Sequence, residues 1–318
     1  MPRTIMGYVV HFTGMHQIGL ALLSVAVFLL SAVPLELQRR IVNDVIGKGA
    51  FRTLFWLAAT YALVAMAEQS LKLVLNVYRG WVAESTVRRL RNGVRGIGVA
   101  SDVASGSHAD TGVEVAMILE EAEPIGGFTG ISISEPLLQG GILASVIGYM
   151  LFIESELAWL GLAFFVPQMV FVPLLQLAIN RRAEARILTK REISGTIVEG
   201  AFPEGRALEE APIQRVFALN MGIYKLKYSM NLLMNLMHHL AVAVSLCVGG
   251  WLAVQDRIEV GTVVAIVGGL GKINDPWGDL VNWAREFSVV GVKYRLFADA
   301  ADRLADAAQA RPAAICAN

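Results

Sequence analysis

The sequence has 318 residues, of which 55% are hydrophobic and only 17% are charged, and its mean hydropathy is +0.54. Ordinary soluble chains carry roughly 25% charged residues, so this composition excludes a typical soluble protein and indicates a membrane protein. The 27 basic and 27 acidic residues balance, and there is no basic excess of the kind that binds nucleic acid. Two cysteines, Cys247 and Cys316, are too few for a disulfide framework.

Six apolar segments are candidate membrane-spanning helices, since a helix needs about 20 apolar residues to cross roughly 30 Å of hydrocarbon. In chain order they comprise residues 18–35, 54–77, 136–153, 157–179, 232–254 and 260–273. The last is shorter than a span needs, and it suffices only if its helix continues through the following NDPWGDLVNWAREF. We therefore predict an all-α membrane protein with six transmembrane helices embedded in the lipid bilayer.

Lysine and arginine are distributed unevenly between the segments that connect these spans. Of the 27, 21 fall on the side of both termini and of two long connections, residues 79–135 and 180–231, five fall on the other side, and Lys72 lies within a span. An excess of these residues marks the cytoplasmic side. We predict an integral plasma (inner) membrane protein with both termini in the cytoplasm. One outer segment opposes the trend with four basic residues: Arg39, Arg40, Lys48 and Arg52.

The long connections predicted to be cytoplasmic have the periodicity of helices, because apolar residues recur every three or four residues. This holds for residues 113–128 and 191–231, with breaks near SDVASGSHADTG and at Pro203 and Pro212. We therefore expect the membrane helices to run on into the cytoplasm as long helical extensions.

Motifs in two regions resemble those of one transporter family. Residues 249–297 contain a short outer turn, an apolar run, an Asp-Pro dipeptide ending at Pro276 and a closing helix. In the first long connection, GVEVAMILEEAEPI is similar to the family pattern G-x-[LV]-x-x-x-[IL]-x-x-[DE]. The order and spacing of these motifs, together with the six predicted spans, resemble those of the transmembrane domain of exporter-type ABC transporters (ABC transmembrane type-1). The resemblance covers residues 1–310 and leaves 311–318 as a C-terminal tail.

The resemblance implies the translocation subunit of an ABC transporter, which acts as a homo- or heterodimer and moves a substrate by means of ATP hydrolysis. The sequence contains no Walker A loop, no Walker B run and no LSGGQ signature. We therefore expect ATP to be bound and hydrolysed by a separate ABC ATPase subunit. For this chain we expect neither enzymatic activity nor a bound cofactor, and nothing in the sequence identifies the substrate or the direction of transport.

The octapeptide GGLGKIND, residues 268–275, superficially looks like a phosphate-binding loop. The motif G-x-x-x-x-G-K-[ST] requires a glycine where Ile266 stands and a hydroxyl where Ile273 stands. We therefore predict that Lys272 binds no nucleotide and lies near the membrane interface.

Four residues inside the spans are candidates for a substrate path: Glu68, Lys72, Asn235 and His238. Glu68 and Lys72 stand at i,i+4, the favourable order for an ion pair, and ionisable groups within a membrane are functional candidates. A neutralised pair that only packs against other helices explains the same spacing.

Polar residues in the fifth span, such as Asn235 and His238, either line a path or bond to a neighbouring helix. His238 and His239 project about 100° apart on a helix, so the two cannot share one metal ion and we predict no metal site.

The resemblance further implies that the ATPase binds at the tips of the cytoplasmic extensions. The matching segment is residues 101–110, represented by Ser101, Asp102, Val103 and Asp110, with residues 191–200 as a second tip. The polar stretch 101–110 interrupts the helical period, which favours a turn at the point farthest from the bilayer.

Two other functions fit the same spans. One is a gradient-driven transporter in which Glu68, Lys72 and His238 or His239 relay protons. The other is a membrane scaffold or sensor that transports nothing. Loss of transport on collapse of a proton gradient would favour the first, and absence of any flux would favour the second.

Overall fold

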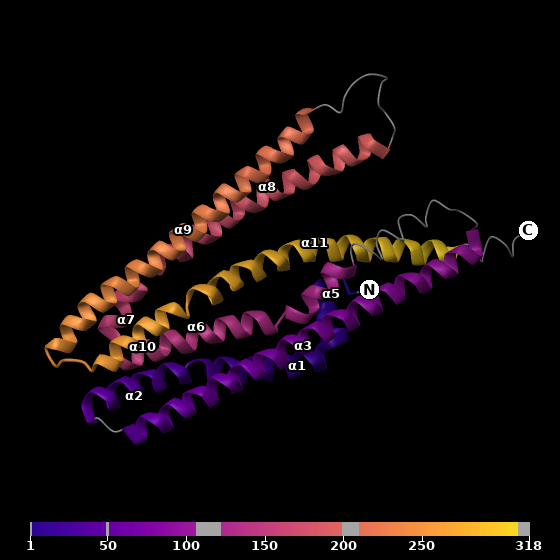
Figure 1. Cartoon of the computed structure of the whole chain (residues 1–318). Coiled ribbons are helices and arrows are strands. Elements are labelled where there is room, and N and C mark those ends of the chain that lie inside the picture. The colour runs from indigo at the N-terminus through magenta and orange to yellow at the C-terminus, as the bar shows by residue number, and fades with distance from the viewer. Residues whose placement is uncertain (1, 49–50, 106–121, 199–209, 311–318) are drawn as a thin grey trace, which may run out of the picture. The chain divides into compact units, whose positions relative to one another are not determined.

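The computed structural model describes residues 2–48, 51–105, 122–198 and 210–310, and nearly all of them are helical (Figure 1). No strand occurs in these ranges, so the predicted all-α class is confirmed. The helices are α1 (Ile5–Ser31), α2 (Val33–Lys48), α3 (Phe51–Ser105), α5 (Ala122–Ile131), α6 (Ser134–Ile153), α7 (Ser155–Leu162), α8 (Val166–Val198), α9 (Glu210–Val254), α10 (Val260–Gly271) and α11 (Asn274–Ala310).

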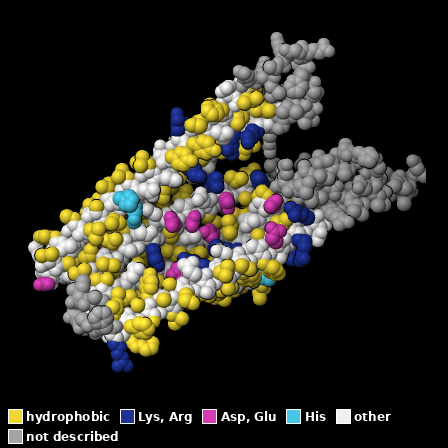
Figure 2. Space-filling model, in the orientation of Figure 1, with side chains coloured by type: hydrophobic (Ala, Val, Ile, Leu, Met, Phe, Trp, Pro, Cys, Tyr) yellow, Lys and Arg dark blue, Asp and Glu magenta, His cyan; other side chains and the backbone are white. Residues whose placement is uncertain are grey.

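Five helical segments are long and apolar enough to cross a membrane. They are Ile5–Asp44, Arg52–Gly93, Ala122–Ile153, Ser155–Lys190 and Ala211–Val254. Hydrophobic side chains cover much of the visible surface of the described helices, as a lipid-facing protein requires (Figure 2). The chain is thus a multi-pass membrane protein. The sixth predicted span corresponds to α10, which has only 12 residues, and the count of six is not confirmed.

The chain divides into two compact units. The first unit comprises residues 1–149 and 275–318, and it holds α1, α2, α3, α5, most of α6 and nearly all of α11. The second unit comprises residues 150–274 and holds α7, α8, α9 and α10. The predicted tail, residues 311–318, lies outside the described residues.

Prolines explain where four of the helices begin. α2, α6, α8 and α11 each carry a proline as their second or third residue: Pro34, Pro136, Pro167 and Pro276. Proline lacks the N–H that would extend the preceding helix, whereas the first turn of a new helix needs no such donor. Each proline therefore ends one helix and is accommodated at the start of the next.

Hydrogen bonds connect the break between α5 and α6 to two other helices of the first unit, α1 and α11. Because Pro136 cannot donate to the carbonyl of Ser132, that oxygen instead accepts a hydrogen bond of 3.1 Å from Nε1 of Trp283 in α11. Ser24 of α1 donates to the carbonyl of Ser134 at 3.2 Å. Buried carbonyl groups need such partners, so these bonds hold α1 and α11 against the break.

The first unit has an apolar cluster formed by the start of α1, α3, α5 and α11. Val9, Ile125, Tyr294 and Phe297 are fully buried in it. The Tyr294 hydroxyl donates to the carbonyl of Pro2 at 2.7 Å, and burial raises the pKa of this tyrosine to about 12. The N-terminal segment is thereby fixed against α11.

Two glycines allow α5 to lie directly on α3. A Cβ at Gly126 would overlap the Val87 side chain, and one at Gly130 would overlap the carbonyl oxygen of Arg79. These glycines are four residues apart and form the small-residue spacing that brings membrane helices into close contact. Between them, Gly127 faces open space.

In the second unit, α8 and α9 run side by side as a long pair, and α7 and α10 pack on α9 (Figure 1). Arg182 of α8 donates to the carbonyl of Gly222, and Arg186 donates to the Asn220 side chain, both at 3.2 Å. Toward the C-terminal end of α9 the contacts with α7 and α10 are apolar: Gly249 of α9 lies against Leu157 of α7 and Val263 of α10.

The basic residues that oppose the predicted orientation are partly neutralised. Arg39 and Arg40 of α2 both pair with Glu36, at 2.9 Å and 2.6 Å. Tyr149 of α6 donates to the same carboxylate at 2.7 Å. One carboxylate thus balances part of the outer basic charge, and the orientation stays a prediction.

Candidate functional site

A buried ion pair between α3 and α6 is the centre of the candidate site, in the first unit. Nη1 of Arg79 lies 2.5 Å from Oε2 of Glu135, and the two side chains are only 9% and 16% exposed. Nε of Arg79 donates to the Ser134 hydroxyl at 2.8 Å. The partners lie more than fifty residues away in sequence, so only the packing of α5 and α6 on α3 brings them together.

Gln139 extends this ion pair to α11. Its Nε2 donates to Oε1 of Glu135 at 2.8 Å and to Oδ2 of Asp279 at 3.0 Å. Glutamine one turn after Glu135 thus bridges two carboxylates that stand on different helices. We call Arg79, Ser134, Glu135, Gln139 and Asp279 the Arg79 network.

The Arg79 network is incompletely satisfied. Nη2 of Arg79 is buried and has no hydrogen-bond partner among the described residues. Asp279 lies in α11, outside the five candidate spans; burial raises the pKa of its carboxyl, Glu135 and Asp275 raise it further, and Arg79 lowers it. Two carboxylates therefore compete for one guanidinium that still has a donor to offer.

A second group of buried polar side chains lies between α1, α3 and α5. Gln17 of α1 donates to the Thr129 carbonyl at 2.8 Å, and the Thr129 hydroxyl lies 3.1 Å from that of Thr86. Oε1 of Gln17 is buried without a partner among the described residues. Unsatisfied polar atoms are costly inside a membrane protein, so this second polar group is also a candidate for binding a polar solute.

Sequence reasoning missed the Arg79 network. In the sequence Arg79 is only one of many basic residues on the predicted cytoplasmic side, and no motif assigns a role to Glu135 or Asp279. A signal was present, because Glu135 directly precedes Pro136 and Asp279 follows Pro276 by three residues. Glu135 thus stands in the first turn of α6, and Asp279 stands one turn further into α11, after the first-turn Asp275.

The structure places Glu68 and Lys72 together, as predicted. Lys72 Nζ lies 2.7 Å from Oε1 of Glu68 on α3, and the carboxylate side chain is 7% exposed while the lysine is 34% exposed. Both stand on the same helix as Arg79 but take no part in its network. The pair is neutralised locally, and its role in a substrate path stays a prediction.

Asn235 and His238 lie on α9 in the second unit, whereas Glu68 and Lys72 lie on α3 in the first unit. Asn235 is exposed, and His238 is half-buried. His238 lines a cavity of about 10 Å³ with Gln168 and Asn274, and Oε1 of Gln168 has no partner among the described residues. The cavity is the size of one water molecule, so it is too small for a larger solute.

The predicted ATPase-binding tip lies mostly outside the described residues. Ser101, Asp102 and Val103 belong to α3, which continues to Ser105. The first five residues of the predicted turn segment 101–110 are thus helical, while residues 106–110 lie outside the described residues, so the turn stays a prediction. The side chains of these residues and the whole of Asp110 fall outside the described part, as do residues 199 and 200 of the second tip.

The segment GGLGKIND forms the end of α10 and the turn to α11. The backbone N–H of Lys272 bonds to the carbonyls of Gly269 and Leu270, and that of Ile273 bonds to Leu270. A phosphate-binding loop needs such N–H groups free to point at the ligand. The local geometry agrees with the sequence argument against a nucleotide site here.

No protein-family model matches the chain, and no curated protein sequence matches it significantly. Among the described residues, no group of three or more His, Cys, Asp or Glu side chains is arranged to hold a metal ion. The site is therefore assigned from its geometry and chemistry alone.

Proposed function

We propose that this protein is the membrane-spanning subunit of a transporter of the ABC exporter type, which works as a dimer and is driven by a separate ATPase subunit. The observation that carries the proposal is the length of three helices. At about 1.5 Å per residue, α3, α8 and α9 are about 80, 50 and 70 Å long, against roughly 30 Å of hydrocarbon.

The parts of α3, α8 and α9 that exceed the membrane thickness are rich in basic residues, which supports a soluble partner on one side of the membrane. The distal halves of these helices carry most of their basic residues, including Arg88, Arg89, Arg182 and Arg186. Basic residues favour the cytoplasmic side. Long rigid helices that leave the bilayer as a packed pair, such as α8 and α9, can transmit a movement of a bound cytoplasmic subunit to the membrane segments.

The Arg79 network supports transport over a purely structural role. A charged, incompletely bonded guanidinium held inside a membrane protein is costly, and such residues mark solute or ion pathways. In the proposed mechanism the network changes its bonds when the helices move. Its spare donor then becomes available to a polar group of the substrate.

A test of the proposal starts from the purified chain in mild detergent. We expect it to have no ATPase activity alone and to retain an ABC ATPase subunit when it is isolated from its native membrane. Val103→Asp should reduce co-purification of that subunit, and Val103→Ala is the matched control. Recovery of the intact chain without any ATPase, from membranes that transport normally, would overturn the proposal.

Orientation needs a separate measurement. In a background without Cys247 and Cys316, single cysteines at Ser155 and Gln255 should react with an impermeant reagent on intact cells, and one at Ser194 should not. The background must lack Cys247 because this residue is exposed on α9. Labelling at Ser194 would place the long helices on the outer side.

A gradient-driven transporter is the second candidate, favoured by the ionisable pairs within the candidate spans. Glu68, its partner Lys72, and Glu135 beside Arg79 are groups that could relay protons. Loss of transport on collapse of the proton gradient at constant ATP would support this function. Transport that persists without the gradient and stops without ATP would support the ABC function.

A further inference from the structure

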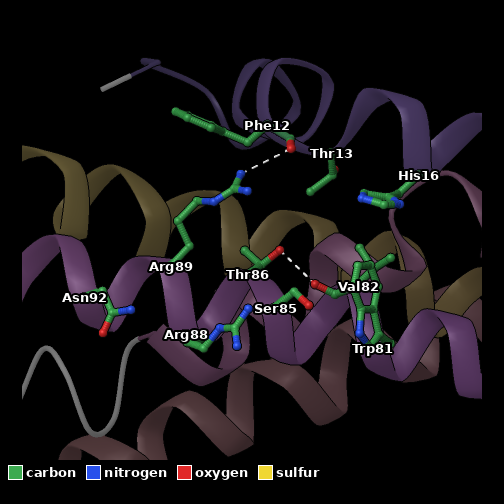
Figure 3. A pocket seen from close by; sticks show the side chains of 10 residues that line it. All are labelled: Phe12, Thr13, His16, Trp81, Val82, Ser85, Thr86, Arg88, Arg89 and Asn92. Atoms are coloured by element: carbon green, nitrogen blue, oxygen red, sulfur yellow. Dashed lines mark hydrogen bonds between the residues drawn. The ribbon is translucent and has the colours of Figure 1, made fainter.

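A cavity of about 330 Å³ lies between α1 and α3 in the first unit (Figure 3). Arg88, Arg89 and Asn92 of α3 line one end of it, and His16 of α1 and Trp81 of α3 line the other. No carboxylate is among its lining residues. The cavity is thus basic, and it takes no part in the Arg79 network.

Arg89 is held in place by α1. Its Nη1 donates to the carbonyl of Phe12 at 3.2 Å, and its guanidinium carbon lies 5.4 Å from the centroid of the Phe12 ring. This contact leaves the remaining N–H groups of Arg89 for a ligand. A guanidinium fixed in this way is suited to charge-assisted hydrogen bonds with phosphate oxygens.

Arg88 supplies a second positive charge at the same cavity. It is exposed, and among the described residues it has neither a hydrogen-bond partner nor an ion-pair partner. Ser85, one turn earlier on the same face of α3, adds a hydroxyl to the lining. Two guanidinium groups, with hydroxyl and amide donors beside them, suit a phosphate ligand better than a carboxylate ligand.

Apolar side chains continue from the cavity along both helices. On α3, Val74, Val77 and Trp81 share the face of Arg88, and they are 52%, 64% and 54% exposed. On α1, Met15 is 82% exposed beside Phe12. In a bilayer these surfaces contact acyl chains, and Trp81 with Tyr78 has the character of an interfacial aromatic pair.

We propose that this cavity binds the phosphate head group of an anionic phospholipid, whose acyl chains lie on the exposed apolar faces of α1 and α3. Arg88 and Arg89 bind the phosphate, and Ser85 and Asn92 bind its remaining oxygens. Basic cavities between membrane helices bind anionic head groups in this way. The exposed apolar faces of α1 and α3 favour a lipid over a free phosphate, because a free ion would make no contact with them.

The test is native mass spectrometry of the full chain in detergent with added lipid. The probes are palmitoyl-oleoyl phosphatidylglycerol, which is anionic, the phosphatidylcholine with the same chains, and inorganic phosphate. We expect phosphatidylglycerol to bind at least about tenfold more tightly than phosphatidylcholine, as the loss of one or two charge-assisted bonds implies. Millimolar inorganic phosphate should not displace it.

Arg88→Gln is the decisive variant, because Arg88 makes no contact that holds the described fold. It should weaken phosphatidylglycerol binding about fivefold or more, while the thermal midpoint without lipid stays unchanged. Arg89→Gln should weaken binding at least as much. Arg91→Gln is the matched control, since Arg91 stands on the same helix outside the cavity and should bind lipid like the wild type.

Three results would overturn the proposal. Equal binding of the two lipids would show that charge is not recognised. Displacement of phosphatidylglycerol by inorganic phosphate would make the cavity a free-anion site. Equal loss of binding in Arg88→Gln and Arg91→Gln would show a general effect of charge on the helix rather than a site.

Discussion

The two units of this protein hold their helices together by different chemistry. In the first unit, glycine lets backbone meet backbone between α5 and α3, and buried charges join α3, α6 and α11. In the second unit the close glycine contacts between helices are with side chains: Gly161 lies against Leu270, and Gly249 lies against Leu157 and Val263. Three of its buried polar atoms, Oε1 of Gln168, Nε of Arg186 and Oγ of Ser245, have no partner among the described residues.

This difference bears on how each unit tolerates change. A charge network and a glycine–backbone contact are both specific to one geometry, because a guanidinium needs its carboxylate and a carbonyl oxygen cannot move aside. A leucine side chain facing a glycine can adopt another rotamer. We therefore expect substitutions in the first unit to cost more stability than the same substitutions in the second.

The largest effect is expected when the central carboxylate of the first unit loses its charge. Glu135→Gln leaves the buried Arg79 without its ionic partner, which should lower the free energy of unfolding by about 2–4 kcal/mol. The full cost of an unpaired buried charge is moderated because Asp279 remains close to Arg79. Unfolding in detergent, followed by intrinsic fluorescence, measures this loss.

Glu156→Gln in α7 is the matched control, since Glu156 is exposed in the second unit and its loss should change stability by less than about 0.5 kcal/mol. Combining Arg79→Met with Glu135→Met should recover part of the loss, because it removes both charges together. If Glu135→Gln were as stable as the wild type, the ion pair would not hold α6 to α3.

A smaller effect is expected from adding one methyl group at the glycine contacts. Gly130→Ala places its Cβ against the Arg79 carbonyl and should cost about 1–3 kcal/mol. At Gly161 the Cβ would lie 2.9 Å from Cδ1 of Leu270, which can turn away, so Gly161→Ala should cost less than about 1 kcal/mol. Thermal unfolding of the purified variants compares the two units directly.

Gly127→Ala provides the reference for Gly130→Ala. It lies on the same helix and faces open space, so the helix preference of alanine should leave stability unchanged or raise it by up to about 1 kcal/mol. Equal stability of Gly127→Ala and Gly130→Ala would mean that α5 does not lie against α3 as described.

The smallest effect is expected at Asp279, and its sign is opposite. Because its folded-state pKa is raised above the ordinary 3.8, the ionised form is disfavoured in the folded protein. Asp279→Asn should therefore keep or slightly increase stability at neutral pH, within about 1 kcal/mol, since the asparagine oxygen still accepts from Gln139.

The pH dependence sharpens this prediction. In the wild type, the penalty of the Asp279 charge is present at neutral pH and is relieved as the pH falls through the folded pKa. Asp279→Asn should lack this gain on acidification, and the difference between the two proteins should shrink toward low pH. A constant difference in thermal midpoint from pH 7 to pH 4 would contradict the assignment.

Much of the architecture could be predicted because it depends on local properties. Runs of apolar residues located the first five membrane segments. The i,i+4 spacing was enough to pair Glu68 with Lys72. The turn predicted within residues 101–110 falls beyond the described end of α3 at Ser105 and stays a prediction.

By itself, the sequence determined that this is a helical membrane protein, since hydropathy and proline positions act over one or two turns. Only the tertiary structure decided which glycine carries a helix contact, because Gly127 and Gly130 differ in the direction they face and not in their neighbours' composition. It also decided that Arg79 meets Glu135 and that Arg89 meets Phe12, across fifty-six and seventy-seven residues. Such pairs carry no local pattern, because packing between helices, and not their order in the chain, sets the distance between the charges.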